Sequence, residues 1–181
     1  MGKIVVHEFI SLDGVFEDPT WTFAHGFDPK MGETIAGLMT PSNAILLGRK
    51  TYEAFYPAWS ERTAEQDPGA PFFNETPKYV VSGTLQRVEW QNSTLLGPYD
   101  ADAIGGLKDR VEGGIYVSGS GTLVRGLLAD GLVDELHLFV FPTVLGAGER
   151  LFAGGTPIKL LLGGSDVYDN GVVHVGYRLA E

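Results

Sequence analysis

Residues 115–129 read IYVSGSGTLVRGLLA, and this stretch indicates the fold class more clearly than any other part of the chain. A short apolar run from Ile115 to Val117 is followed by Gly119-Ser120-Gly121 and then by a helical pattern that begins near Thr122. Glycines let a phosphate group approach the backbone, while the free amides and the positive dipole end of a helix supply donors. The stretch therefore predicts a strand, a tight turn and a helix, with an anion site formed by Gly119, Ser120, Gly121, Thr122 and Leu123.

This glycine-rich turn differs from the dinucleotide fingerprint of a Rossmann fold. That fingerprint has a third glycine, and an acid about 20 residues further on at the far end of the next strand. Here Val124 stands where the third glycine would be, and Asp134 and Glu135 stand at the beginning of the next predicted strand. A Rossmann site is therefore not expected, and an ordinary strand-to-helix turn is the alternative to an anion site.

Strands and helices alternate along most of the chain. The patterns predict strands over residues 3–12, 44–47, 78–82, 94–96, 115–117, 136–141, 158–162 and 172–179, and helices over residues 31–39, 49–56, 101–111 and 122–128. Alternation through residue 130 implies right-handed crossovers and a mostly parallel sheet, to which antiparallel strands are added at the end. We therefore expect an α/β fold with a mixed, mainly parallel central sheet flanked by helices, in one domain over residues 1–181.

The composition narrows the range of partners. The chain has 13 Lys and Arg against 23 Asp and Glu, a formal net charge of −10, and no Cys. An acidic protein is a poor match to duplex nucleic acid or anionic lipid, which require a basic face, and no run of about 18 apolar residues could span a membrane. Without Cys there is no thiolate nucleophile, disulfide or Cys-ligated metal. We expect a cytoplasmic protein that binds a small molecule, with neither nucleic acid nor membrane as its partner.

Two further strand ends carry residues that suit an anion. The apolar run to Leu47 ends in Gly48, and Arg49-Lys50-Thr51 opens a helix, where basic residues oppose the helix dipole and so do not serve helix stability. The strand that begins at Lys78 ends in Ser82-Gly83-Thr84. Solvated surface charges and a plain turn are the alternatives. Because ligands of open α/β sheets bind at the carboxyl ends of the strands, the three ends together favour a phosphorylated ligand.

Few residues are candidates for catalysis or substrate binding. Side chains alternate along a strand, so His7 and Glu8 lie on opposite faces of the first one. Asp13 stands at the carboxyl end of that strand, where it could meet a ligand or simply form an Asp-Gly turn. Glu135 enters a later strand, facing either a pocket or solvent. The four His residues show no metal-ligand spacing, so no metal site is expected.

The order of these motifs resembles one known family. The series runs SLDG at 11–14, LGRKTYE at 47–53, the strand 78–84, VSGSGTL at 117–123, GLVDEL at 131–136 and PTVLGAG at 142–148. Over nearly its whole length the chain is similar to the dihydrofolate-reductase-like superfamily, and within it to the C-terminal reductase domain of the bifunctional riboflavin-biosynthesis deaminase/reductase.

The resemblance implies NADPH as the cofactor and assigns roles to the three strand ends. Arg49 and Thr51, in the junction that also holds Gly48 and Lys50, would bind the adenosine 2′-phosphate and the pyrophosphate. Ser82 and Thr84 would bind the adenine-side ribose phosphate, and residues 119–123 the pyrophosphate. The nicotinamide would lie beside Leu12 and Asp13.

The resemblance also implies a reaction and a substrate side of the site. The family reduces a ribosylaminopyrimidine, 5-amino-6-(5-phosphoribosylamino)uracil, by hydride transfer from NADPH. Asp13 becomes the candidate catalytic residue, orienting the substrate or relaying a proton, and His7 and Glu135 become substrate-binding candidates. His7 stands where the riboflavin enzyme usually carries Lys. Residues 15–30, a loop that keeps Phe16, Trp21, Phe23 and Phe27, would act as a lid.

Two other functions stay open on the sequence. Gly48-Arg49-Lys50-Thr51 is closer to dihydrofolate reductase, so a pterin reductase is the alternative within the class; its ring-polarising carboxylate would be Asp28 or Glu33. A protein that binds NADPH without hydride transfer is the alternative outside it. A homodimer is expected in each case, because the apolar strands Leu136–Phe141 and Leu160–Leu162 supply more apolar surface than one small sheet needs to bury.

Overall fold

The computed structural model describes residues 1–180, and within them eight strands form one sheet in the order β4-β3-β2-β5-β1-β6-β8-β7. Strands β1 to β6 pair in parallel, β8 pairs antiparallel to β6, and β7 pairs antiparallel to β8. The strands are β1 (Lys3–Ser11), β2 (Ser42–Gly48), β3 (Lys78–Val81), β4 (Ser93–Gly97), β5 (Gly114–Ser118), β6 (Glu135–Phe141), β7 (Leu160–Val167) and β8 (Val173–Leu179). The mixed, mainly parallel sheet expected from the sequence is confirmed.

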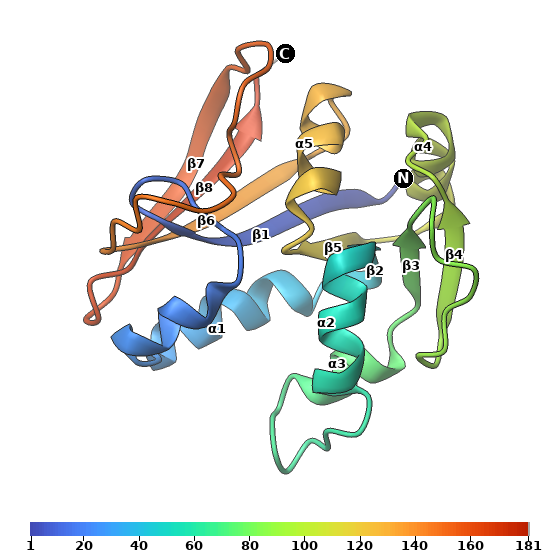
Figure 1. The fold of residues 1–181 in the computed structure, drawn as a ribbon, viewed down its shortest axis with the longest axis horizontal. Coiled ribbons are helices and arrows are strands. Elements are labelled where there is room, and N and C mark those ends of the chain that lie inside the picture. Colours follow the sequence, from blue (N-terminus) through green and yellow to red (C-terminus); the bar gives the residue numbers. More distant parts are fainter. Residues whose placement is uncertain (181) are drawn as a thin grey trace.

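Helices cover both faces of this sheet (Figure 1). They are η1 (Pro19–His25, a 3-10 helix), α1 (Pro29–Met39), α2 (Arg49–Trp59), α3 (Ala70–Glu75), α4 (Ala101–Arg110) and α5 (Gly121–Ala129). Apolar residues of α4 and α5 pack with Ile4 and Val6 of β1. On the other face, α2 and α3 pack on β2, and α1 packs on β6. Because the central strands are buried on both sides, they read as continuous apolar runs rather than as alternating ones.

The expected end of α2 at Pro57 is wrong. The helix continues through Pro57 to Trp59, and the Ser60 amide donates to the Tyr56 carbonyl. The ring of Trp59 stacks on Phe73 of α3 at 4.3 Å between centroids. Proline removes only one hydrogen bond, and here it lies near the end of the helix, so tertiary packing of Trp59 outweighs the loss.

Three other segments differ from the expectation. Residues 70–75, where the sequence predicted neither helix nor strand, form α3, and part of the aromatic loop forms η1. Strand β7 extends to Val167 rather than ending at residue 162. Its second half, GGSDV, has neither apolar alternation nor strong strand propensity. Hydrogen bonds to β8 hold it, and such pairing does not show in a local pattern.

Candidate functional site

The carboxyl ends of β2, β3 and β5 lie at one edge of the sheet because these strands are parallel. A cavity of about 560 Å³ lies there, against the first turns of α2 and α5. It brings together the three strand ends singled out in the sequence. The cofactor-binding candidates that line it are Gly48, Arg49, Lys50, Thr51, Ser82, Thr84, Ser120, Gly121, Thr122 and Leu123. The other two candidates, Leu12 and Gly119, lie outside this lining.

The turns before α2 and α5 are hydrogen-bonded to each other. The Gly48 amide donates to Ser120 Oγ at 2.9 Å, and the Ser120 amide donates to Thr51 Oγ1 at 2.8 Å. Gly119 and Ser120 both have φ of 60°, a left-handed conformation that turns the chain sharply from β5 into α5. The two helix amino ends are thereby held side by side, and residues of both first turns line the cavity.

The cations around the cavity are each paired with a carboxylate. Arg49 Nη1 lies 3.0 Å from Glu53 Oε2, one helical turn away on α2. Glu149 faces two cations, with Oε1 at 2.5 Å from Arg125 Nη2 and Oε2 at 4.0 Å from Lys50 Nζ. The local positive charge is therefore largely offset within the chain, as expected for a protein of formal net charge −10.

The strand end at Ser82 is a tight hydroxyl-capped turn. Ser82 Oγ accepts from the Leu85 amide at 3.0 Å and from the Thr84 amide at 3.2 Å. Both side chains still line the cavity, so the turn is compatible with a ligand role as well as with its local structure.

Tyr99 and Glu149 line this cavity but were not singled out in the sequence, whereas Phe16 was expected as part of the loop that covers the site. The Tyr99 ring lies against Gly126 of α5, where an added Cβ would come within 3.0 Å of it, and Tyr99 Oη donates to Asp130 Oδ2 at 2.6 Å. The Phe16 ring covers Gly121 so closely that no side chain fits there. Glu149 belongs to the same group. No local pattern marks Tyr99 or Glu149, because each reaches the cavity from a segment distant in sequence from the three strand ends.

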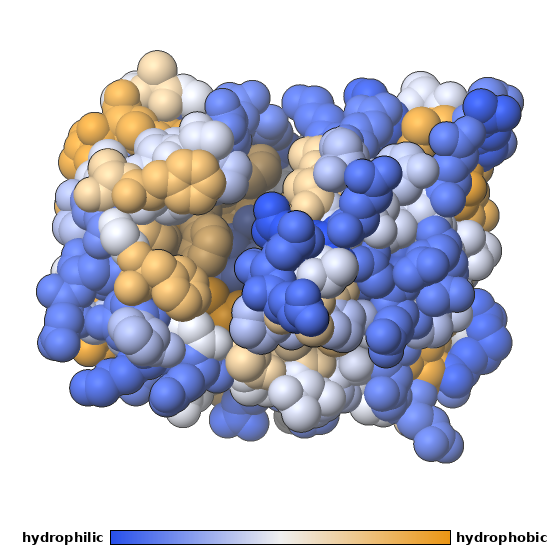
Figure 2. Space-filling model, turned by 90° about the horizontal axis from the view of Figure 1, so that it is seen from below, coloured by the Kyte–Doolittle hydropathy of each residue, from blue (hydrophilic) through white to orange (hydrophobic). Residues whose placement is uncertain are grey.

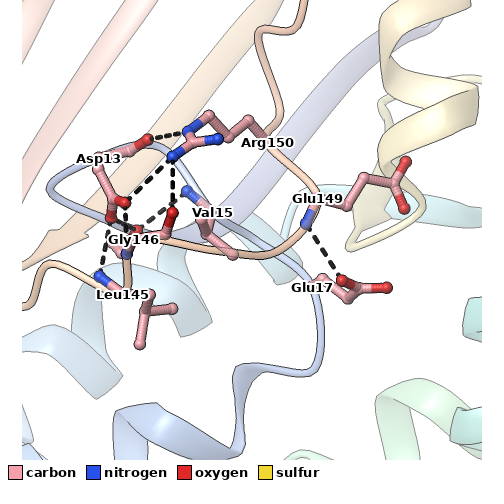
Figure 3. A network of polar contacts seen from close by, with 8 residues as sticks. Asp13, Val15, Glu17, Leu145, Gly146, Glu149 and Arg150 are labelled. Atoms are coloured by element: carbon pink, nitrogen blue, oxygen red, sulfur yellow. Dashed lines mark hydrogen bonds and ion pairs between the residues drawn. The ribbon is translucent and has the colours of Figure 1, made fainter.

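Asp13 holds two loops together (Figure 3). Its carboxylate accepts from Ser11 Oγ at 2.6 Å, from the Leu145 amide at 3.1 Å and from the Gly146 amide at 2.9 Å, and it pairs with Arg150 Nη2 at 3.4 Å. The hydrogen bond from Ser11, followed by those from the two amides, holds the pKa of Asp13 well below its usual value. The carboxylate is therefore ionised at neutral pH, and its role in orienting the substrate or relaying a proton stays a prediction.

The sequence model described as the RibD C-terminal domain matches residues 2–174. The chain belongs to the RibD C-terminal domain family. It is similar to the protein YyaP of Bacillus subtilis, with 26% identity over 97% of this chain and 94% of YyaP.

Solved structures of RibD-like and dihydrofolate reductase proteins share the fold. A protein from Shewanella sp. PV-4 superposes with a TM-score of 0.80 at 21% identity, covering 100% of both chains. Riboflavin biosynthesis reductase Rib7 of Saccharomyces cerevisiae gives a TM-score of 0.63 at 16% identity, over 99% of this chain and 90% of the Rib7 chain. Dihydrofolate reductase of Enterococcus faecalis, solved with NADP(H), gives 0.67 at 14% identity, over 99% and 98%.

In this RibD C-terminal domain, His7 is enclosed by protein. Its residue is 4% exposed, and its Nδ1 lies 2.6 Å from Tyr116 Oη, while Nε2 has no hydrogen-bond partner among the described residues. Burial, followed by repulsion from His137 and His174, lowers the pKa of His7 to about 3. The imidazole is therefore neutral and enclosed by protein, and a direct contact of His7 with the substrate stays a prediction.

Glu8 points to the opposite face of β1 and is also buried, with 2% exposure. Its Oε1 has no partner among the described residues. Burial raises the pKa of Glu8 well above its usual value, although a hydrogen bond from the Gly119 backbone acts in the other direction. The carboxyl group is therefore protonated over a wider pH range than an exposed Glu, directly behind the turn that leads into α5.

Glu135 lies at the other end of the sheet. It pairs with Val5 in the parallel register between β1 and β6, whereas Ser11, beside the Asp13 loop, pairs with Phe141. Six residues of strand separate the two levels, about 20 Å at 3.3 Å per residue. Glu135 Oε1 lies 3.4 Å from Lys3 Nζ instead. The structure therefore does not bring Glu135 together with Asp13 and the cavity.

The two carboxylates considered for a pterin ring have other surroundings. Asp28 caps α1, with Oδ1 accepting from the Lys30 amide at 2.8 Å and Oδ2 accepting from the Asp169 amide at 3.0 Å. Glu33 is exposed on α1. Neither carboxylate has the buried, unpaired position that polarising a pterin ring requires.

The aromatic segment after β1 is only partly packed. Trp21 and His25 make edge contacts with Phe141, each at 5.6 Å between ring centroids, whereas Phe23 is 80% and Phe27 69% exposed. From the side of α1, α2 and α3, the surface shows hydrophobic side chains beside a hollow, with a mainly hydrophilic region across from them (Figure 2).

Among residues 1–180, no helix combines the length and the apolar character needed to cross a membrane.

Proposed function

We propose that this chain is an NADPH-dependent reductase of the riboflavin-biosynthesis type, acting on a ribosylaminopyrimidine or a related heterocycle. Membership of the RibD C-terminal domain family supports a reductase. The observation that carries the proposal is the cavity at three parallel strand ends, lined by two helix amino ends and by hydroxyl side chains. Rib7 and dihydrofolate reductase, which share the fold, are reductases by name, and the latter was solved with NADP(H).

The cavity residues fit a phosphate-rich cofactor. The first-turn amides of α2 and α5 suit its pyrophosphate, and Arg49 suits the 2′-phosphate because a guanidinium binds phosphate through paired hydrogen bonds. Ser82 and Thr84 supply hydroxyls at the adenine side. Bound NADPH supplies the hydride, and this chain's own residues position it and limit the access of water.

Asp13 acts in this proposal as a positioning residue. It fixes the end of β1 and the 143–150 loop relative to each other, and Leu12 follows β1 at that end with 67% exposure. The nicotinamide end would lie beside Leu12, and the partly packed segment 15–30 would cover the substrate. Proton delivery then comes from solvent or substrate rather than from the Asp13 carboxylate, whose pKa is held low.

The test of the cofactor is a titration of the purified protein with NADPH and with NADH. Arg49→Ala should weaken NADPH binding about tenfold, the effect of 1.4 kcal/mol, and leave NADH binding nearly unchanged, because only NADPH carries the 2′-phosphate. Arg62→Ala is the matched control, since Arg62 pairs with Asp67 outside the cavity. Equal weakening of both cofactors, or no binding by the parent chain, would contradict the proposal.

The substrate is tested by turnover. Oxidation of NADPH with the ribosylaminopyrimidine but not with dihydrofolate supports the riboflavin-type reaction, and the reverse result supports a pterin reductase. Tight NADPH binding without oxidation by either substrate identifies a binding protein.

We also propose that the chain forms a homodimer through the β7 side of its sheet. Strand β7 is an edge strand that is exposed along almost its whole length, and Leu161 and Leu162 are 45% and 61% exposed there. An apolar, unpaired edge is a site where another chain can add.

A further inference from the structure

Glu149 is a carboxylate placed inside a cavity otherwise suited to phosphate. Its Oε1 lies 2.5 Å from Arg125 Nη2 and its Oε2 4.0 Å from Lys50 Nζ. Arg125 Nη2 also donates to Thr122 Oγ1 at 3.2 Å, so the pair lies against the first turn of α5. Lys50, Thr122 and Glu149 all line the cavity. The carboxylate thus uses the same cations and lies near the same helix end that an incoming phosphate group would use.

The loop that carries Glu149 is tied to a second cover of the same helix end. The Phe16 amide donates to the Glu149 carbonyl at 3.1 Å, and the Glu149 amide donates to Glu17 Oε2 at 3.1 Å. The Phe16 ring lies directly on Gly121, the first residue of α5. One pair of loops, residues 13–17 and 145–150, therefore places both the Glu149 carboxylate and the Phe16 ring at the start of α5. Figure 3 shows how Glu149 and Glu17 join these two loops.

Two anions cannot share this position without repulsion. A carboxylate near a helix amino end is favourable by itself, because it complements the helix dipole. A pyrophosphate bound to the same amides and cations would lie close to Glu149, and like charges at a few ångströms repel strongly in a partly buried cavity. Binding of the phosphate-bearing ligand must therefore displace the Glu149 carboxylate from Arg125 and Lys50.

We propose that Glu149 is an internal anion that occupies the phosphate subsite of the free protein and lowers its affinity for pyrophosphate-bearing ligands. This inference rests on the proposed cofactor site. The loop that carries Glu149 is also bound by Asp13, whose carboxylate accepts from the Leu145 and Gly146 amides beside the end of β1. Glu149 is therefore a residue that sets cofactor affinity, although it contributes no attractive contact to the cofactor.

The experiment compares Glu149→Gln with the parent chain by calorimetric titration with NADPH and, separately, with inorganic pyrophosphate. Gln keeps the size of the side chain and removes its charge, so both ligands should bind about tenfold more tightly, a gain of 1.4 kcal/mol. Glu112→Gln is the matched control, because it changes the net charge equally at an exposed position outside the cavity lining, and it should leave both dissociation constants unchanged. Thermal unfolding of each variant verifies that it is folded, and Glu149→Ala provides a second neutral variant.

The outcomes separate this inference from the proposed function. Equal or weaker binding of pyrophosphate by both neutral variants overturns the inference, because Glu149 then positions Arg125 rather than competing with the ligand. A parent chain and variants that bind no NADPH, with pyrophosphate still bound more tightly by the variants, overturn the cofactor assignment and leave the internal anion supported. Tighter binding by Glu112→Gln as well shows a general charge effect and also overturns the inference.

Discussion

At the scale of single residues, β1 carries two adjacent ionisable side chains, His7 and Glu8, whose pKa values burial shifts in opposite directions. Burial lowers the pKa of His7 to about 3 because the enclosed imidazolium would lose its hydration, and it raises the pKa of Glu8 because the carboxylate would lose its own. The alternation of a strand puts the two on opposite faces, so they do not neutralise each other. Each makes the stability of the fold depend on pH.

His7 leads to a prediction about acid stability. Because its folded pKa of about 3 lies below the ordinary 6.5, the unfolded chain binds the proton more tightly, and the contribution of neutral His7 is lost as pH falls from 6.5 towards 3. His7→Gln removes this titration. We therefore expect the melting temperature of the parent chain to fall more steeply than that of the variant between pH 7 and pH 4.5, measured by circular dichroism.

His25→Gln is the control for that comparison, because His25 lies outside β1, where His7 and Glu8 are buried, and its Nε2 contacts Thr143 Oγ1. Parallel pH profiles for the parent chain and His7→Gln would show that His7 is protonated in the folded state without penalty.

At the scale of elements, the candidate site depends on how α2 and α5 are joined. Neither helix amino end has a side-chain cap of its own, since Gly48 and Ser120 cap no amide within their own helix. Instead, each turn donates a backbone amide to a hydroxyl of the other: the Gly48 amide donates to Ser120 Oγ, and the Ser120 amide donates to Thr51 Oγ1. The cross-link explains why hydroxyl residues occur in both turns, whether or not a ligand is bound.

Thr51→Val tests this cross-link. The variant keeps the shape of the side chain but removes the acceptor of the Ser120 amide, which should cost about 1 kcal/mol in the free energy of unfolding. Because the two helix ends then separate more easily, NADPH affinity should fall as well. Denaturant unfolding and NADPH titration measure the two effects.

Thr40→Val is the matched control, since the Thr40 hydroxyl donates to the Ala36 carbonyl on the exposed surface of α1. Loss of stability without loss of NADPH affinity in Thr51→Val would limit the cross-link to a structural role.

At the scale of the whole molecule, the sheet is asymmetric. In the order of the sheet, helices cover the six strands from β4 through β3, β2, β5 and β1 to β6. Strand β7, at the far edge, keeps its side chains exposed. The same edge strand has no Pro, and its only charged side chain is Asp166, so it has little protection against pairing with a second chain.

Leu162→Glu tests the homodimer at this edge. A charge on the exposed apolar strand should convert a dimer of about 39 kDa, twice 19.5 kDa, into a monomer, as measured by light scattering after size exclusion. NADPH affinity should stay unchanged, because the cavity lies at the opposite side of β1 in the strand order. Val144→Glu, at an exposed apolar residue outside the sheet, is the control. A parent chain that elutes as a monomer would contradict the dimer.

Local patterns predicted the central strands, the main helices and the three glycine- or hydroxyl-bearing strand ends. These features depend on neighbouring residues: apolar runs for buried strands, and glycine at turns that need a left-handed backbone, as at Gly119. The end of α2 and the length of β7 were missed, because Trp59 and residues 163–167 are held by partners distant in sequence.

The sequence by itself thus determined the fold class and most of the residues that line the cavity at the three strand ends. Only the tertiary structure decided what surrounds them: Phe16 and Glu149 cover α5, Asp13 ties two loops, His7 is enclosed, and Glu135 lies at the other end of the sheet. The physical reason is the strand order, which inserts β5 between β2 and β1 and so brings together turns about 70 residues apart, such as Gly48 and Ser120. Burial, pairing and pKa follow from those long-range contacts and leave no signal in local periodicity.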